Sequence, residues 1–374
     1  MLGCLAGGTI LACGAPLEAQ VIWTNSGAGS WFDGSNWSSG LTPGTQDAAL
    51  VANGGVAQAA AGTVAVNRLE VGRNAGSGSF TSSGADVLVD SAFDVGEVTG
   101  DIATAGANVQ NTGQVLIEDA ASLEIGVNNQ GGDFDIGQTG ATVGGIATSM
   151  ASATILRHGD ITIATNLEVA PASADAASTS HANGELTINT ADTLSVDGEL
   201  NIGAVNGAGA TDSTAVATLQ NIAAVSIGGA ANIGIAKGTS SVGNSANATL
   251  VIDASTVEIG FAHPLALEDL NIGDVSTVGA GLLHGKGVVS VSGSHLSVGN
   301  RIDVARLTGG GPASTAFGRL EAAGSHIVAD DLTVAETTAG LAGTATGEVM
   351  LAATLVELGT SLRLSPGSTV GFGL

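Results

Sequence analysis

The sequence predicts an all-β protein, a right-handed parallel β-helix with about ten coils and three short strands in each coil. The first observation is a set of short segments in which apolar and polar residues alternate, as in Leu186-Thr187-Ile188 and in residues 200–202. Alternation with a period of two places both apolar side chains of a segment on one face of a strand. The second observation is that these segments recur at intervals of roughly 32 residues, which is typical of solenoids and other repeat arrays.

The phase of the repeat defines the coil. In most units the second and third strands end five or six residues apart, and glycine follows many strands at the expected corners. A constant phase favours parallel stacking over hairpins, and a propeller blade would need four strands and a longer unit. Corner insertions are expected at 127–133 and 261–268.

Three series of apolar residues give the expected register. The first strands end at Ile117, Ile155, Ile188, Leu219, Ile252, Val291, Leu320 and Leu351. The second strands end at Val66, Val89, Ile125, Ile163, Val196, Ile227, Ile259, Val298, Val328 and Leu358. The third strands end at Val71, Val95, Ile136, Val169, Ile202, Ile233, Ile272, Val304, Val334 and Leu364. Between the third strand and the next coil lie stretches of small residues, which are expected to form one loop-rich face at 204–217, 235–248 and 305–318.

Composition excludes several classes of protein. Hydrophobic residues make up 44% of the 374 residues and charged residues 11%, the reverse of a disordered chain. Beyond the N-terminus no apolar run reaches the length of a transmembrane helix, so no integral membrane segment is expected in the mature chain. The net charge of −25 would repel nucleic acid and anionic membrane surfaces, so no nucleic-acid partner is expected.

Residues 1–19 are predicted to be a secretory signal peptide, because an apolar core and small residues precede a cleavage position after Ala19. The signal is atypical, since no lysine or arginine occurs before Arg68. Both cysteines, Cys4 and Cys13, lie in this leader, so the remaining chain has no disulfide and no thiolate metal site. Lipid attachment at Cys13 is the alternative to simple cleavage.

Residues 20–51 are predicted to form an N-terminal cap that contains all three tryptophans, Trp23, Trp31 and Trp37. The exposed end of a solenoid needs covering, and bulky aromatic side chains can close the first coil. The alternative is a platform on which the indoles stack against carbohydrate. Residues 52–374 are assigned to the β-helix repeat domain.

The tryptophans belong to a longer pattern, W-x7-W-x4-NW-x5-P-x3-D, which runs from Trp23 to Asp47. This opening resembles that of bacterial exported proteins with autotransporter-associated β-strand repeats, and similar openings occur in surface proteins that carry PEP-CTERM sorting signals. The resemblance covers residues 21–51, and the repeats that follow are consistent with it. It implies an extracellular or cell-surface β-solenoid, usually without enzymatic activity.

No catalytic, cofactor-binding or metal-ligating residue is assigned from the sequence, because no established catalytic or phosphate-binding motif occurs. The densest local set of acidic residues is Glu268, Asp269 and Asp274 near His263, and a solvated charged loop is expected there. The alternative is an enzyme site, which would need several carboxylates converging on one face.

Two histidines, His295 and His326, occupy similar positions in neighbouring coils. If the strands stack in register, their side chains lie about 5 Å apart on the surface. A metal-binding or pH-sensitive pair is the alternative to a simple surface stack.

The middle residues of the third strands form a polar column that is expected to point outward. Amides in the middle of this column relieve repulsion between carboxylates and can hydrogen-bond along the ladder. No cofactor is expected, although the acidic ends could bind calcium. The members are Asp135, Glu168, Asn201, Asn232, Asn271 and Asp303.

These observations favour a secreted or cell-surface β-solenoid with a structural or adhesive role, located outside the cell or on a bacterial surface. The expected partner is an extracellular glycan, a matrix component or a cell surface. The alternative is a carbohydrate-active enzyme, a polysaccharide lyase or glycoside hydrolase on the same scaffold. Such an enzyme needs carboxylates that converge in one groove, often with a base.

Overall fold

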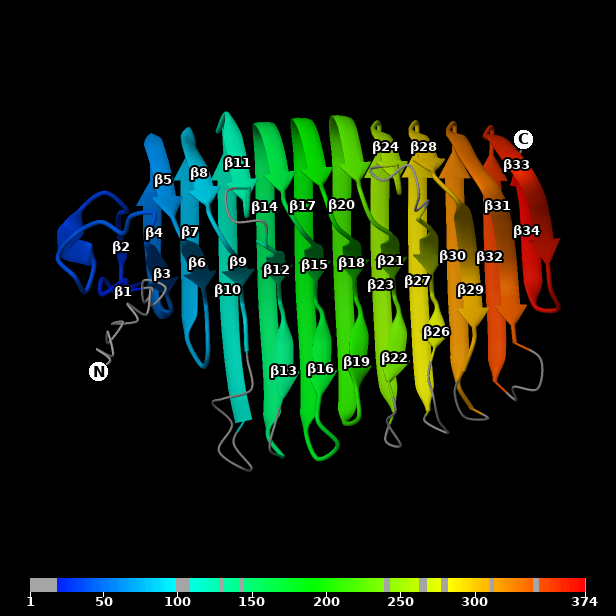
Figure 1. Ribbon diagram of the computed structural model, residues 1–374, viewed down its shortest axis with the longest axis horizontal. Helices are drawn as coiled ribbons and strands as arrows, with labels where there is room; N and C mark the ends of the chain where they lie inside the picture. The colour runs from blue at the N-terminus through cyan, green and yellow to red at the C-terminus, as the bar shows by residue number, and fades with distance from the viewer. Residues whose placement is uncertain are drawn as a thin grey trace, which may run out of the picture.

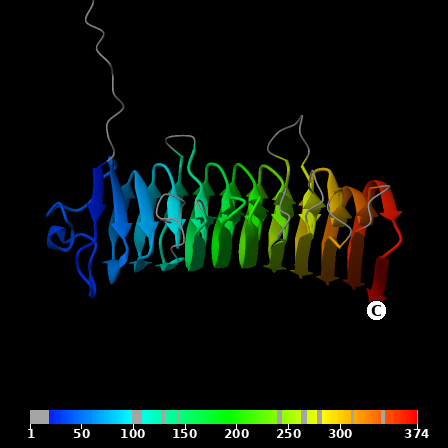
Figure 2. The same cartoon turned by 90° about the horizontal axis from the view of Figure 1, so that it is seen from below.

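The computed structural model describes residues 19–98, 108–127, 131–141, 144–238, 243–261, 268–276, 282–309, 313–338 and 343–373. Residues 1–18 of the predicted signal peptide, both cysteines, His263 and parts of the two expected corner insertions lie outside these ranges. The described chain forms 34 strands in one parallel sheet that winds into a β-helix, which confirms the predicted fold class. The coils stack into a rod with the first and last described strands at its opposite ends (Figures 1 and 2). No helix among the described residues has the length and apolarity to span a membrane.

The first strands of the coils form the longest stack. In the central coils, the first and second predicted strands are one continuous strand of 18 residues that bends at Arg157, Thr190 or Asn221, each with a positive φ. The stack is preceded by β2 (Ala28–Ser30), which pairs with its first member. Its members are β4 (Asn53–Ala59), β7 (Ser77–Ser83), β10 (Asn108–Glu118), β14 (Ile146–Ile163), β17 (Thr179–Val196), β20 (Ala210–Ile227), β23 (Asn244–Asp253), β27 (Leu283–Ser292), β30 (Thr315–Ala323), β32 (Thr344–Ala352) and β34 (Ser368–Gly373).

The second and third stacks close the main core. The second stack contains the later halves of β14, β17 and β20, together with β5 (Gly62–Val66), β8 (Ala85–Val89), β11 (Ser122–Ile125), β24 (Thr256–Ile259), β28 (His295–Val298) and the first halves of β31 (His326–Thr337) and β33 (Leu355–Leu364). The third stack contains β1 (Ala19–Ile22), β3 (Asp47–Val51), β6 (Arg68–Val71), β9 (Phe93–Val95), β12 (Phe134–Ile136), β15 (Leu167–Val169), β18 (Leu200–Ile202), β21 (Ala231–Ile233), β25 (Leu270–Ile272), β29 (Arg301–Leu307) and the later halves of β31 and β33.

Most of the predicted register is confirmed. Every expected third-strand residue from Val71 to Leu364 pairs with its predicted neighbour in the next coil. Two predicted residues are wrong. Val328 pairs with Ser297, one residue before the predicted Val298, and Ala329 is the buried residue that pairs with Leu358. The partner of Val291 is Ala322, two residues beyond the predicted Leu320.

A fourth, short stack follows the third strands and was not predicted. It runs through the stretches that were expected to be loops, and it packs against the beginning of the first strands. A second small core of Val98, Val109, Ala141, Ala147 and Ala174 lies between these two layers. The strands of the fourth stack are β13 (Thr139–Ala141), β16 (Ala172–Ala174), β19 (Val205–Gly207), β22 (Ala236–Gly238), β26 (Val275–Ser276) and the end of β29.

The two cores are separated by a waist, where the first strand crosses close to the corner after the third strand. A Cβ added at Gly287 would lie 2.2 Å from the Ile233 carbonyl oxygen, so the position cannot hold a side chain without a shift. Where the corner residue is alanine, the strand opposite carries glycine, as in Ala170 with Gly184 and Ala305 with Gly318. The abundance of small residues in this chain follows from this close approach.

Aromatic residues fill the N-terminal end of the main core. Trp23, Trp31 and Trp37 are at most 2% exposed, and their rings meet edge to face with centroids 5.0 and 4.7 Å apart. Trp31 also contacts Phe80, which joins this group to the coil interior. Because the indole faces are buried, they do not form a platform for carbohydrate. The short helical turn η1 (Gly34–Asn36) lies between the last two tryptophans.

Candidate functional site

The most distinctive polar feature is a groove along the outside of the rod, between the third and fourth stacks. The corner residue after most third strands has a positive φ, for example Gly137 and Ala170, and it turns the chain so that two outward faces meet at a concave angle. The middle residue of the third strand then faces the residue three positions later. Two ion pairs with this spacing, Arg73 with Glu70 and Arg306 with Asp303, span the angle.

The polar column lies along this groove. The expectation that its side chains point into solvent is wrong in several coils. Asp135, Asn232 and Asp303 are only 6%, 8% and 1% exposed, because the fourth-stack side of the groove covers them. Glu168, Asn201 and Asn271 are partly exposed. The sequence pattern identified the column but gave no sign of the corner that covers it.

Amides join the middle of the column into a hydrogen-bonded ladder, as predicted. The Asn201 side chain donates to the Glu168 carboxylate at 3.0 Å, Asn232 donates to Asn201 at 2.9 Å and Asn271 donates to Asn232 at 2.9 Å. Each amide therefore links one coil to the coil before it.

An N-terminal cluster of Arg68, Glu70, Arg73, Asp94 and Glu97 fills the groove at the early coils. Arg68 lies 2.7 Å from the Asp94 carboxylate and 3.1 Å from Glu70, and Arg73 lies 3.2 Å from Glu97. Oxygens of the three carboxylates lie within 4.8 Å of one another, a spacing that suits a cation. Two guanidinium groups already pair with these carboxylates, and they supply the positive charge that a metal ion would bring.

Burial has the largest effect on the pKa of Asp94 in this cluster. Desolvation, with a further contribution from the charge of Glu97, raises the pKa of Asp94 to about 7 despite the attraction of Arg68. Three carboxylates face two arginines, so the cluster carries an excess negative charge when all its groups are ionised.

A C-terminal cluster of Asp269, Asp274, Arg301, Asp303 and Arg306 fills the other end. Arg301 and Arg306 both lie 2.9 Å from Asp303, and Arg306 lies 2.9 Å from Asp274. Burial raises the pKa of Asp303 to about 6 against the attraction of both arginines. The prediction of a solvated loop is therefore wrong for Asp274, which is buried and paired with an arginine from the next coil.

Between the two clusters the groove opens into a central hollow of about 360 Å³. The hollow spans three coils and combines hydrogen-bonding groups with the apolar surfaces of Pro171 and Ala204. Its polar residues are Gln138, Glu168, Ser173, Asn206 and the buried Thr139.

Two carboxylates beside the hollow have no arginine or lysine partner among the described residues. Asp135 is buried next to Glu168 in the column, and its Oδ1 atom has no hydrogen-bond partner. Burial, followed by the charges of Asp94 and Glu168, raises the pKa of Asp135. Burial also raises the pKa of Glu168, although the hydrogen bond from Asn201 opposes this shift.

The two histidines stack as predicted. His295 pairs in register with His326, and their ring centroids are 4.8 Å apart. Nε2 of His326 lies 3.3 Å from the exposed Glu357 carboxylate. Among the described residues, the one group of three or more histidine, cysteine or acidic residues with a spacing that suits a metal ion lies in the N-terminal cluster. The histidine pair therefore has no third metal ligand among these residues.

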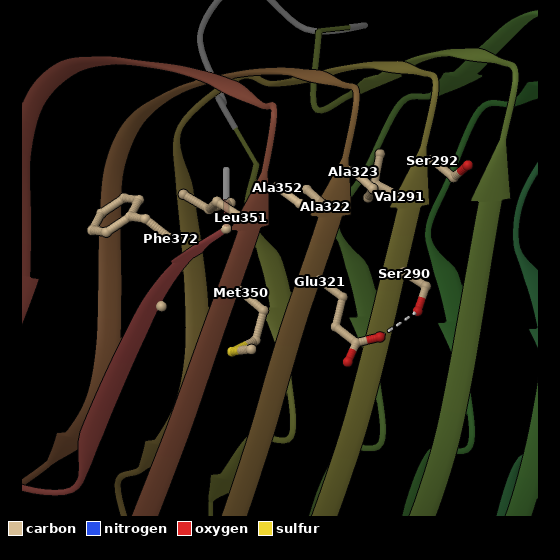
Figure 3. Close-up of a pocket in the computed structure, with 12 residues that line it drawn as sticks. Ser290, Val291, Ser292, Glu321, Ala322, Ala323, Met350, Leu351, Ala352 and Phe372 are labelled. Atoms are coloured by element: carbon tan, nitrogen blue, oxygen red, sulfur yellow. Dashed lines mark hydrogen bonds between the residues drawn. The ribbon is translucent and has the colours of Figure 1, made fainter.

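A larger cavity, of about 470 Å³, lies at the C-terminal coils (Figure 3). Its lining is mainly apolar or small and includes Met350, Leu351 and Phe372. Glu321 is its one ionisable residue, and this carboxylate accepts a hydrogen bond from Ser290 and pairs with Arg319. A single paired carboxylate does not provide the acid and base that hydrolysis needs.

No family model, no curated protein sequence and no solved structure matches this chain.

Proposed function

We propose that this protein is a secreted or cell-surface β-solenoid with a structural or adhesive role. The observation that carries the proposal is that most polar groups of the groove bond to neighbouring coils. The amide ladder joins four successive coils, and each arginine cluster joins two neighbouring coils. Side chains used in this way stabilise a long rod and are not free to act on a substrate.

The extracellular location is supported by the sequence. The apolar leader, the absence of cysteine after Cys13 and the tryptophan pattern of residues 23–47 all fit an exported protein. A strongly acidic surface argues against nucleic acid and anionic membranes as partners. The proposed partner is an extracellular glycan, a matrix component or another cell surface.

Two measurements test the proposal. Bacteria that express the full chain are treated with protease while intact, and a surface protein is expected to be cleaved. Beads coated with the purified protein are then tested for retention on arrays of glycans and matrix proteins. Beads coated with the core variant Ile202→Asp serve as the unfolded control. Full protection of the chain inside intact cells, or equal retention of both bead types, would contradict the proposal.

A carbohydrate-active enzyme is the second candidate, and one observation favours it. Asp94, Asp135 and Glu168 lie in successive coils of one groove, and all three have raised pKa values, as a general acid does. Incubation with a panel of polysaccharides should then release reducing ends, and Glu168→Gln should abolish the release. Absence of any release by the wild-type chain across the panel removes this candidate.

A further inference from the structure

We propose that the central hollow binds an amine-bearing saccharide, with its ammonium group against Glu168 and its hydroxyl groups on Gln138, Ser173 and Asn206. This inference rests on the proposed adhesive role and names a ligand class for it. Three properties of the hollow carry the inference: its unbalanced charge, the spacing of its carboxylates and the nature of its lining.

The charge argument comes from the pattern along the groove. Arginines pair with the carboxylates of the polar column in the N-terminal and C-terminal clusters, and neutral asparagines occupy the column at Asn201, Asn232 and Asn271. Within the polar column, Asp135 and Glu168 are the two carboxylates without an arginine or lysine partner among the described residues, and Glu168 lines the open hollow. A cation in the hollow would supply the missing countercharge.

The spacing of the carboxylates argues for an extended cation over a bare metal ion. Among the described residues, the carboxylate oxygens with metal-compatible spacing are those of Glu70, Asp94 and Glu97, outside the hollow. Asp135 is buried beside Glu168 in the neighbouring coil and does not line the hollow, so one partly exposed carboxylate is left to contact the ligand. This arrangement suits a single ammonium group better than a divalent ion that requires several converging oxygens.

The lining argues for a sugar. Carboxamide groups of Gln138 and Asn206 both donate and accept hydrogen bonds, and the Ser173 hydroxyl does the same, which matches the hydroxyl groups of a saccharide. Pro171 and Ala204 offer apolar surface for the C–H face of a sugar ring. The volume of about 360 Å³ is at the lower end of ligand sites, which fits one or two sugar units.

The test is calorimetric titration of the full chain with a fully deacetylated chitosan trisaccharide, at slightly acidic pH where its amines are protonated. The N-acetylated trisaccharide and cellotriose are the neutral comparisons, and calcium chloride tests a metal ion. Glu168→Gln keeps an acceptor for Asn201 and removes the charge. Glu258→Gln, at an exposed position on β24, removes the same charge away from the groove.

The expected result is that the deacetylated trisaccharide binds more tightly than both neutral sugars, and that Glu168→Gln weakens its binding about tenfold to a hundredfold. Pro171→Trp, which fills the hollow from its apolar side, should abolish binding. Glu258→Gln should bind like the wild type. Equal affinity for charged and neutral sugars, an unchanged Glu168→Gln, or binding of calcium alone would overturn the inference. If the wild-type protein binds none of these sugars in the calorimeter but its beads are still retained on the arrays, this ligand class is wrong and the proposed adhesive role is unaffected.

Discussion

Ile202→Asp gives the sharpest test of the stacked core. Ile202 is fully buried in the third stack, between Val169 of one neighbouring coil and Ile233 of the other. The described side chains of the surrounding core cluster are all apolar. The aspartate therefore enters an environment without a partner for its charge.

The expected loss of stability has two parts. Removal of most of the isoleucine side chain from a packed core costs about 2–5 kcal/mol. Keeping the new carboxyl group protonated at pH 7, against an unfolded pKa near 3.9, costs about 4 kcal/mol more. The sum of about 6–9 kcal/mol is comparable to the whole free energy of unfolding of many domains.

The assay is urea unfolding followed by circular dichroism at several pH values, with Ile202→Asn as the matched control that does not titrate. A carboxyl with a raised folded pKa stabilises most below its unfolded pKa, and this contribution is lost as pH rises. The difference between the aspartate and asparagine variants should therefore grow by about 1.4 kcal/mol per pH unit above pH 4. A loss under about 2 kcal/mol, or a difference that does not change with pH, would refute inward placement of Ile202.

Three further predictions concern the waist and the N-terminal cluster. Gly287→Val should lower the free energy of unfolding by about 1–3 kcal/mol or more through overpacking, whereas Gly131→Val, in open space, should be nearly neutral in the same urea titration. Because the pKa of Asp94 is raised to about 7, wild-type stability should fall between about pH 4 and pH 7, and Asp94→Asn should flatten that fall. A parallel pH profile in the variant would contradict this cause. Arg68→Gln removes a guanidinium from among the three carboxylates, so calcium should raise the melting temperature of this variant more than that of the wild type. Identical shifts in both proteins would show that arginine does not replace a cation there.

Much of the fold could be predicted because the third strands carry large apolar residues at a nearly constant spacing. The errors arose where this signal is weak. The apolar spacing predicts Val328 as the inward residue, but the ladder places Ala329 in the core, and a shift of one residue exchanges the two faces of a strand. The shift at Leu320 is two residues, which keeps the same face, so periodicity alone could not detect it.

The site was less predictable than the fold. The polar column was visible because its residues alternate with buried ones, yet its burial depends on a corner at which alanines such as Ala170 and Ala305 adopt a positive φ. That conformation is uncommon for a residue other than glycine, so no local pattern indicates it. The partners of Asp274 and Asp94 come from neighbouring coils, Arg306 and Arg68, and only the stacking register brings them together.

The narrow waist has a consequence for how this rod can vary. At every level the crossing leaves room for one methyl group at most, shared between corner and strand, as the pairing of Ala170 with Gly184 illustrates. A coil copied from one level to another meets the same clearance, so the rod can gain or lose whole coils by duplication or deletion. A larger side chain at the waist of one coil would push its first strand away from the corner and misalign both cores of that coil. The rod should therefore tolerate a change in the number of coils better than a larger side chain at the waist of any one coil.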